Sequence, residues 1–165
     1  MLSEHIQHPL APIWTPESRV LILGTMPSPR SRQEQMYYAH PQNRFWPVLA
    51  AVYDEPVPHP GEERCGLLCR HRIAVWDVLA RCRIEGAADS SIRDPEPNDI
   101  AGLLKNAPIQ AVFTTGQTAA RLYHRLCEPH TGIEAVALPS TSPANARRSL
   151  ADLIAAYAVL RSYTD

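Results

Sequence analysis

The sequence predicts a three-layer α/β/α sandwich around a mainly parallel, four-stranded sheet. Short apolar runs bounded by turn residues are typical of strands that are buried on both faces. Segments with apolar residues at helical spacing separate these runs, so strands and helices alternate along the chain. Because strand–helix–strand connections are right-handed crossovers, this alternation favours parallel strands. The 165 residues suit one domain with one core, without an internal repeat.

The strands come from four apolar segments. They are predicted at residues 20–23, 73–79, 111–115 and 134–138. The apolar positions between Phe45 and Val52 have helical spacing and predict a helix that runs to about residue 53. Pro47 keeps the start of this helix close to Asn43, because proline fits only the first turn of a helix.

The other helices follow the remaining strands or loops. They are predicted at residues 62–70, 98–106, 117–127 and 146–163. Asn98 is a suitable N-cap for the second of them, and Asp99 suits the positive end of its dipole. Gly116 ends the third strand and precedes the third of these helices.

Three segments are expected to be irregular. Residues 1–18 contain three prolines and should form an arm packed on the domain. Residues 54–61 form a proline-rich loop. Residues 83–97 are predicted as a long polar loop, and long ordered loops are often functional.

The composition excludes several classes of protein. Apolar residues make up 45% of the chain and charged residues 20%, so it should fold rather than stay disordered. No apolar run approaches the length of a transmembrane helix. The first eight residues lack a basic region followed by an apolar one, which argues against a secretory signal. We therefore expect a cytoplasmic protein without a membrane partner.

The cysteines do not form a metal-binding pattern. Cys65 and Cys69 could face one way on a helix, but no second pair or histidine pattern completes a tetrahedral site around them. Together with Cys82 and Cys127 they are expected to be reduced and mostly buried thiols. The sequence predicts no metal and no cofactor.

The positive charges are almost all arginine. The formal net charge is −1, so the total does not require a nucleic-acid partner. Lys105 is the only lysine, which reflects either compositional bias of the genome or a use for arginine as a phosphate ligand. The pairs Arg30/Arg32 and Arg147/Arg148 are expected in loops beside the candidate site, where they would form a small basic rim.

The first candidate site segment follows the strand at residues 20–23. Gly24, Thr25, Met26, Pro27 and Ser28 form a loop at the strand end, where an open α/β sheet places its ligand. Glycine lets a ligand approach the backbone, and the prolines stiffen the loop so that its N–H groups could bind a carbonyl or phosphate oxygen. The segment lacks the Gly-Lys-Ser/Thr ending of a P-loop. An ordinary strand-to-loop turn is the alternative.

The second candidate segment is residues 37–46, Tyr-Tyr-Ala-His-Pro-Gln-Asn-Arg-Phe-Trp. It offers an aromatic ring for stacking and an amide for hydrogen bonding, which an extruded nucleobase requires. Tyr38 could stack and Asn43 could bind the base, while Asn43 as a helix N-cap and Tyr38 as a core residue are the alternatives. Phe45 and Trp46 are expected in the core, and His40 as a hydrogen-bonded scaffold residue.

The third candidate segment is residues 140–145, a small polar loop before the last predicted helix. Helix N-termini attract phosphate. Arg147 and Arg148 are expected in the first turn, where arginine opposes the helix dipole, and a bound phosphate would compensate that cost. A plain capped helix with solvated arginines is the alternative.

Together the three segments resemble the uracil-DNA glycosylase superfamily, in its mismatch-specific and hypoxanthine-specific branches. Residues 24–28, Gly-Thr-Met-Pro-Ser, occupy the place of the first motif. Residues 38–46 are similar to the His-Pro-x-Asn-Arg-Phe-Trp segment that both branches carry. Residues 138–147 fill the place of the second motif, and residues 89–99 look like the hypoxanthine branch. The resemblance covers nearly the whole chain.

The departures from the family pattern favour one branch. Met26 stands where the mismatch-specific branch has its asparagine. The uracil-specific branch has an aspartate in this motif, whereas this chain has no aspartate between Gly24 and Trp46. In the hypoxanthine branch the catalytic asparagine comes from the His-Pro-x-Asn segment, which is Asn43 here. The cysteines do not match the branches that hold an iron–sulfur cluster.

The resemblance implies hydrolysis of the N-glycosidic bond of a deaminated base, most specifically hypoxanthine, in double-stranded DNA. Asn43 would be catalytic, as the residue that aligns water or binds the base edge. The base would be bound by Gly24, Thr25, Met26, Pro27, Ser28 and Tyr38. The DNA would be bound by Ser140, Ser142, Pro143, Ala144, Asn145 and Arg147.

Other interpretations stay open at this point. A uracil or thymine mismatch glycosylase is one alternative, since uracil and hypoxanthine share a carbonyl and a ring N–H on the pairing edge. A non-catalytic nucleic-acid-binding module is another, because the segments lack an acid and a base. A nucleoside hydrolase would need carboxylates for the ribose, and the loops have none. The expected enzyme is monomeric. It is also expected to be monofunctional, since a lyase step requires a lysine in the site and Lys105 is predicted in a helix away from the loops.

Overall fold

The parallel sheet forms as the apolar runs predict. A computed structural model of the chain describes residues 3–165. Its central sheet has four parallel strands in the order β3–β2–β6–β7. The strands are β2 (Val20–Gly24), β3 (Ile73–Asp77), β6 (Ala111–Thr115) and β7 (Ala135–Leu138). The fold class and the mainly parallel sheet are therefore confirmed.

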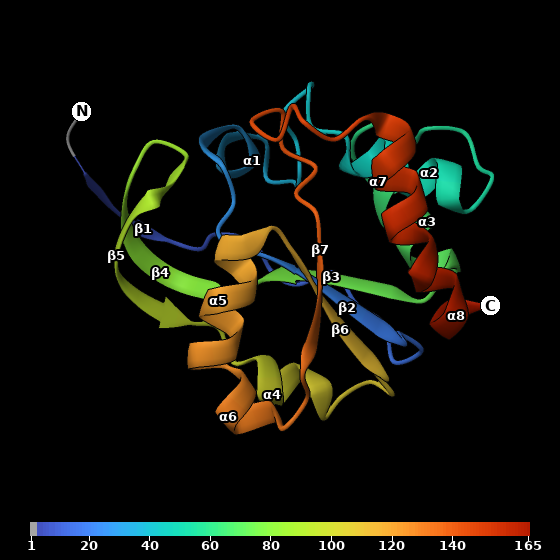
Figure 1. Cartoon of the computed structure of the whole chain (residues 1–165). Coiled ribbons are helices and arrows are strands. Elements are labelled where there is room, and N and C mark those ends of the chain that lie inside the picture. Colours follow the sequence, from blue (N-terminus) through green and yellow to red (C-terminus); the bar gives the residue numbers. More distant parts are fainter. Residues whose placement is uncertain (1–2) are drawn as a thin grey trace.

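Helices cover both faces of this sheet (Figure 1). One face carries α2 (Phe45–Val52), α3 (Glu62–Arg70) and α7 (Leu150–Tyr157). The other face carries α4 (Ile100–Leu104) and α5 (Gln117–Leu126), and α6 (Glu128–Thr131) packs against these two helices. Strand β2 shows why its sequence is continuously apolar: Val20 and Ile22 pack in one layer, and Leu21 and Leu23 in the other. The three-layer prediction is confirmed.

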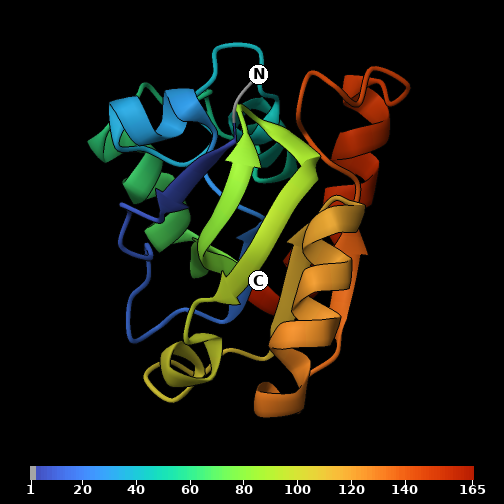
Figure 2. The ribbon, with the colours of Figure 1, turned by 90° about the vertical axis from the view of Figure 1, so that its left-hand side faces the viewer.

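A second, antiparallel sheet was not predicted. It has the order β1–β4–β5 and consists of β1 (Glu4–Gln7), β4 (Leu79–Glu85) and β5 (Ala88–Pro97). Figure 2 shows the β4–β5 hairpin in front, beside α5. Two predictions are therefore wrong: the loop at 83–97 is a strand pair, and the arm is not irregular throughout. Residues 1–2 of that arm lie outside the described residues.

The sequence signals for this hairpin are weak for a physical reason. β4 buries Leu79, Cys82 and Ile84 and exposes residues between them, whereas β5 is polar and has no buried face. Its pairing with β4, rather than an apolar pattern, makes it a strand. The predicted strand at 73–79 is likewise divided, because the chain turns at Val78 from the parallel sheet into β4.

Several helix boundaries differ from prediction. The last helix begins at Leu150 rather than near Ala146, because Ser149 and Asp152 form a capping box there. It continues through η1 (Ala158–Leu160) into α8 (Arg161–Thr164), close to the predicted end. Asp99, not Asn98, caps α4. The short helix α1 (Pro29–Glu34) was not predicted, and it places Arg30 and Arg32 on a helix instead of in a loop.

The four cysteines differ in burial. Cys82 and Cys127 are buried, Cys65 is half-buried and Cys69 is exposed, and all four are free thiols. Burial raises the pKa of the Cys127 thiol to about 11, so this thiol stays protonated at neutral pH. The expectation that the cysteines are buried is correct for Cys82 and Cys127 and wrong for Cys69, whereas their reduced state stays a prediction.

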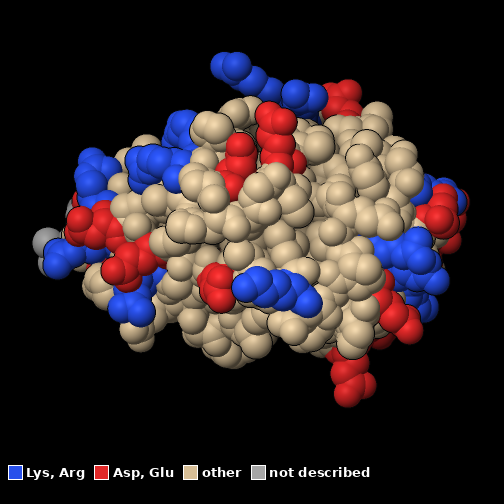
Figure 3. Space-filling model, turned by 90° about the horizontal axis from the view of Figure 1, so that it is seen from below, with Lys and Arg blue, Asp and Glu red and all other residues tan. Residues whose placement is uncertain are grey.

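The described surface shows no dominant charge on the face in Figure 3. Basic and acidic side chains there lie around a mostly uncharged centre, so this face offers no single-sign patch for phosphates. None of the helices in residues 3–165 is long and apolar enough to span a bilayer.

Tyr157 links the last helix to the end of β7, and its removal should measurably destabilise the fold. The residue is fully buried, and its hydroxyl donates to the Pro139 carbonyl at 2.7 Å. Tyr157→Phe leaves that half-buried carbonyl without its donor and should cost about 1 kcal/mol, which lowers Tm by about 2–4 °C. Thermal unfolding followed by circular dichroism measures this. Tyr163→Phe is the control, since the Tyr163 ring packs edge-on against Phe113 and its hydroxyl has no partner within residues 3–165.

Candidate functional site

The three predicted segments meet around one pocket. It has a volume of about 380 Å³ and opens at the carboxyl ends of β2, β3 and β6. The predicted residues in its lining are Gly24, Thr25, Met26, Pro27, Ser28, Tyr38, Asn43, Ser140, Ser142, Pro143 and Ala144. Asn145 and Arg147 do not line it. The structure therefore brings together the predicted catalytic and base-binding residues, and four of the six residues predicted to bind DNA.

Gly24 lies at a point where no larger residue fits. It pairs in register with Asp77, the last residue of β3. A Cβ atom at Gly24 would lie 2.5 Å from Asp77 Oδ1 and 3.1 Å from the Tyr38 hydroxyl. The glycine is required because these two polar groups converge above the strand end, and together they form the floor of the pocket.

The loop after Gly24 is held rigidly and leaves donors free. Arg32 Nη1 donates to the Pro27 carbonyl at 2.9 Å, and the Ser28 hydroxyl caps α1 by accepting the Ser31 N–H. Within residues 3–165, the N–H groups of Met26 and Ser28 donate to no other protein group. Both residues line the pocket, so their N–H groups are available for the anion or carbonyl binding that remains a prediction for this loop.

Tyr38 provides an aromatic wall. Its ring stacks on Phe45 with centroids 3.8 Å apart and planes 12° apart, and its hydroxyl lies 3.3 Å from Thr115 Oγ1. Its φ of 53° places a non-glycine residue in the left-handed region, which is a strained conformation. Burial raises the pKa of the Tyr38 hydroxyl, and the Asp77 carboxylate raises it further. The side chain is therefore a neutral phenol that can donate a hydrogen bond.

Asn43 presents its amide N–H₂ group to the pocket, because its oxygen is occupied. Oδ1 accepts the Phe45 N–H at 2.9 Å and the Thr141 hydroxyl at 2.8 Å. A carbonyl oxygen has two lone pairs, so both are used. The bond from the Phe45 N–H is of the kind that a helix N-cap side chain accepts, as the alternative interpretation of Asn43 expected. The N-cap position of α2 is nevertheless occupied by Arg44. His40 supports the segment: its carbonyl accepts the Asn43 N–H at 2.9 Å.

Arg44 connects the second and third segments. Its N–H donates to the Thr141 carbonyl at 3.0 Å. Its guanidinium donates to the carbonyls of Arg148 and Asn145, at 2.5 Å and 2.9 Å. Residues 145–148 therefore lie in a loop that Arg44 ties to the second segment, and the last helix begins only after this loop. The prediction that Arg147 and Arg148 lie in its first turn is wrong.

Sequence reasoning missed several residues of the pocket. Asp77 and Thr115 lie at strand ends, as Gly24 does, so an acid directly after the apolar run of β3 was an available signal. The hairpin contributes Ile84, Gly86, Ala87 and Asp89 to the lining. No pattern in the sequence places this hairpin over the pocket, because only its pairing in the second sheet does so.

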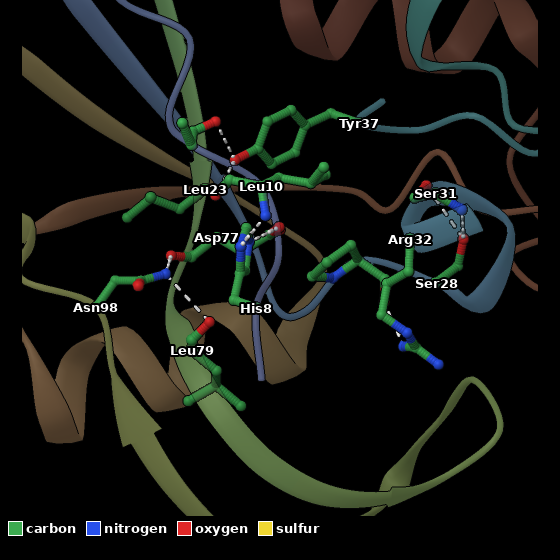
Figure 4. Close-up of polar contacts among 12 residues, drawn as sticks. His8, Leu10, Leu23, Ser28, Ser31, Arg32, Tyr37, Asp77, Leu79 and Asn98 are labelled. Carbon is green, nitrogen blue, oxygen red and sulfur yellow. Dashed lines mark hydrogen bonds and ion pairs between the residues drawn. The ribbon is translucent and has the colours of Figure 1, made fainter. Parts of the chain in front are cut away.

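Two acids, Asp77 and Asp89, line the pocket, and so does His40. Asp77 Oδ2 lies 2.8 Å from Nε2 of His8, a residue of the N-terminal arm (Figure 4). Burial raises the pKa of Asp89, and the Asp77 carboxylate raises it further. Among residues 3–165, no three His, Cys, Asp or Glu side chains are grouped to hold a metal ion.

Comparison with known proteins agrees with this geometry. The family model described as the uracil DNA glycosylase superfamily matches residues 12–161. A protein named Hypoxanthine DNA glycosylase from Methanosarcina acetivorans is 36% identical over 134 residues, which cover 80% of this chain and 84% of that protein. Its namesake from Methanosarcina barkeri is 33% identical over 141 residues, covering 84% and 87%.

A solved structure has the same fold. It is a solution NMR structure from Methanosarcina acetivorans, described as a proposed uracil DNA glycosylase. It superposes with a TM-score of 0.77 at 31% sequence identity, and the match covers 92% of this chain and 96% of that one.

The Arg44 bonds predict that this side chain orders the third segment. Arg44→Ala removes both guanidinium bonds, so residues 142–148 should exchange their amide hydrogens faster while the central sheet is unaffected. Charged hydrogen bonds contribute about 1.5–3 kcal/mol each, so exchange in this loop should rise by about tenfold or more. Hydrogen exchange measured by mass spectrometry detects this. Arg147→Ala, at an exposed position nearby, should leave the exchange pattern unchanged.

Proposed function

Because this chain belongs to the uracil DNA glycosylase superfamily, we propose that it releases hypoxanthine from DNA by hydrolysing the N-glycosidic bond of deoxyinosine. The observation that carries the proposal is the convergence of Asn43, Tyr38 and the 24–28 loop on one pocket at the strand ends. The volume of about 380 Å³ is in the range of small-ligand sites. The names of the two Methanosarcina relatives support hypoxanthine as the base.

The reaction requires the base to leave the duplex and its glycosidic bond to break. An extruded base would stack on the Tyr38 ring, whose other face is supported by Phe45. Bond cleavage passes through an oxocarbenium-like sugar, and negative charge develops on the departing base. In this proposal the N–H groups of Met26 and Ser28, which have no acceptor among residues 3–165, donate to a base carbonyl or ring nitrogen and stabilise this charge.

Asn43 is proposed to act as a hydrogen-bond donor. Both lone pairs of its oxygen are used by Phe45 and Thr141, so only its N–H₂ group remains for the base or for the attacking water. An amide is not a strong base, and the mechanism therefore depends on stabilising the leaving group more than on proton abstraction.

The third segment is proposed to contact the DNA itself. Pro143 and Ala144 are exposed at the rim of the pocket, where they could enter the gap left by the extruded base. Ser140 and Ser142 lie in the same rim, and Arg147 is exposed and free to approach a phosphate. Asn145 does not line the pocket and would act by holding the loop, since its amide donates to the Ser140 carbonyl at 2.9 Å. The proposed substrate is double-stranded DNA, bound by one monomeric, single-domain protein of residues 1–165.

Excision of deoxyinosine should depend on the Asn43 amide. Single-turnover release is measured on otherwise identical duplexes that carry deoxyinosine, uracil opposite guanine, or no lesion. Asn43→Asp keeps the two acceptor bonds and removes the donor, and Asn43→Ala removes both. Loss of one such donor costs about 10²–10³-fold in rate, so both variants should fall by that amount on deoxyinosine. Gln42→Ala, at an exposed neighbouring position, should match the wild type.

The outcomes separate the alternatives. Release of uracil alone would assign the chain to a mismatch-specific activity. Release of neither base, with intact DNA binding, would favour a non-catalytic binding module. Full activity of Asn43→Asp would contradict the donor role.

The enzyme should not form a Schiff base with the abasic product. Lys105 follows α4, is exposed and does not line the pocket, so no lysine amine lies near the sugar. Borohydride added during turnover should therefore trap no protein–DNA adduct, in wild type or in Lys105→Arg. A trapped adduct in the wild type would refute the monofunctional assignment.

A further inference from the structure

The floor of the pocket holds a buried hydrogen bond between a histidine and a carboxylate, and the histidine comes from outside the segment matched by the family model. His8 follows β1 in the N-terminal arm, whereas the family match begins at residue 12. Its Nε2 lies 2.8 Å from Asp77 Oδ2, and the two side chains are only 2% and 5% exposed. Figure 4 shows the two side chains pointing toward each other at the end of β3. A pair this deeply buried is expensive to maintain without a function or complete bonding.

The hydrogen bonds of His8 fix which ring nitrogen carries the proton. The Leu10 N–H donates to His8 Nδ1 at 3.2 Å, so Nδ1 acts as an acceptor and has no proton. The proton is therefore on Nε2, which donates to Asp77 Oδ2. The imidazole acts as an oriented donor to a carboxylate.

This bond leaves the other oxygen of Asp77 facing the pocket. Oδ1 accepts no hydrogen bond from residues 3–165, and it is the atom that a Cβ at Gly24 would approach to 2.5 Å. The backbone of Asp77 is held as well, because Asn98 Nδ2 donates to its carbonyl at 2.9 Å. Asp77 thus presents one fixed, acceptor-only oxygen to whatever occupies the pocket.

We propose that Asp77 is a specificity-determining residue, positioned by His8, that accepts a hydrogen bond from the ring N–H on the pairing edge of the base. This inference rests on the proposed function. Hypoxanthine carries a proton on N1, whereas adenine, from which it forms by deamination, has a bare N1 with a lone pair. An acceptor-only oxygen bonds the first and repels the second. The site would therefore select bases that carry a proton on the ring nitrogen of the pairing edge.

The Asp77 carboxylate can serve recognition of the base but not its departure. A negative charge at the floor cannot stabilise negative charge on the departing base. That stabilisation falls to the donors around it, which are the Asn43 amide and the N–H groups of Met26 and Ser28. Asp77 therefore recognises the base, and these hydrogen-bond donors promote its departure.

The Asp77→Asn variant gives the sharpest test because His8 dictates how the new amide turns. The His8 Nε2–H needs an acceptor, so the amide oxygen should face His8 and the N–H₂ group should face the pocket. A donor would then meet the N1–H of hypoxanthine. The same donor would bond the bare N1 of unsubstituted purine, so the preference between the two bases should shift.

The experiment measures single-turnover release from duplexes with deoxyinosine or deoxynebularine, whose base is unsubstituted purine. The readout is the ratio of the two rates in wild type, Asp77→Asn, His8→Phe and the double variant. The ratio should fall by about 100-fold in Asp77→Asn, since a site built to bond an N–H discriminates strongly. In the double variant the amide is free to turn its oxygen to the pocket, and part of the hypoxanthine preference should return.

Controls separate positioning from stability. His8→Gln can still donate to Asp77 and should keep the wild-type ratio, and His5→Phe, at an exposed position of β1, should do the same. The Tm of each variant is measured alongside. A ratio that is unchanged in Asp77→Asn, or equal losses on both substrates in all variants, overturns this inference alone. A wild type that releases no hypoxanthine overturns the proposed function and this inference with it.

Discussion

The pocket depends on the guanidinium of Arg44, which binds two main-chain carbonyls about a hundred residues away in sequence. This contact holds the 140–148 loop against the segment that carries Asn43. The loop also holds the segment of Asn43 in place. The Thr141 hydroxyl donates to Asn43, and the Thr141 carbonyl accepts the Arg44 N–H. The acceptors are neutral carbonyls, so these hydrogen bonds are charge-assisted and do not neutralise the positive charge of the guanidinium.

The floor of the pocket follows from the register of parallel strands. Gly24 and Asp77 are opposite each other at the ends of β2 and β3, and Thr115 lies at the end of the neighbouring β6. Parallel strands bring their carboxyl ends to one edge, so a glycine and two short polar side chains from distant segments meet there. The second sheet then closes the side of the pocket with the β4–β5 hairpin, and the strand β1 places His8 behind Asp77.

The site works mainly with neutral donors. Burial keeps Tyr38 as a phenol, the Asn43 oxygen is used internally, and the loop after β2 offers backbone N–H groups. Groups that are fixed before the substrate arrives need no reorganisation during the reaction, which makes them effective at stabilising developing charge. Asp77 is the exception, since it offers an acceptor at the floor of the pocket, with His8 bonded to its other oxygen. Its proposed role is accordingly recognition of the base and not stabilisation of its departure.

The sequence by itself determined the parallel sheet, because strands buried on both faces must be continuously apolar, as Val20 to Leu23 are. It also determined the three site segments, because glycine, proline and polar residues at strand ends are local signals. Tertiary structure alone decided the second sheet, since β5 has no apolar pattern and exists through its pairing with β4. It also decided the His8–Asp77 pair, whose members are 69 residues apart. These depend on partners far apart in sequence, and local patterns contain no information about such distant contacts.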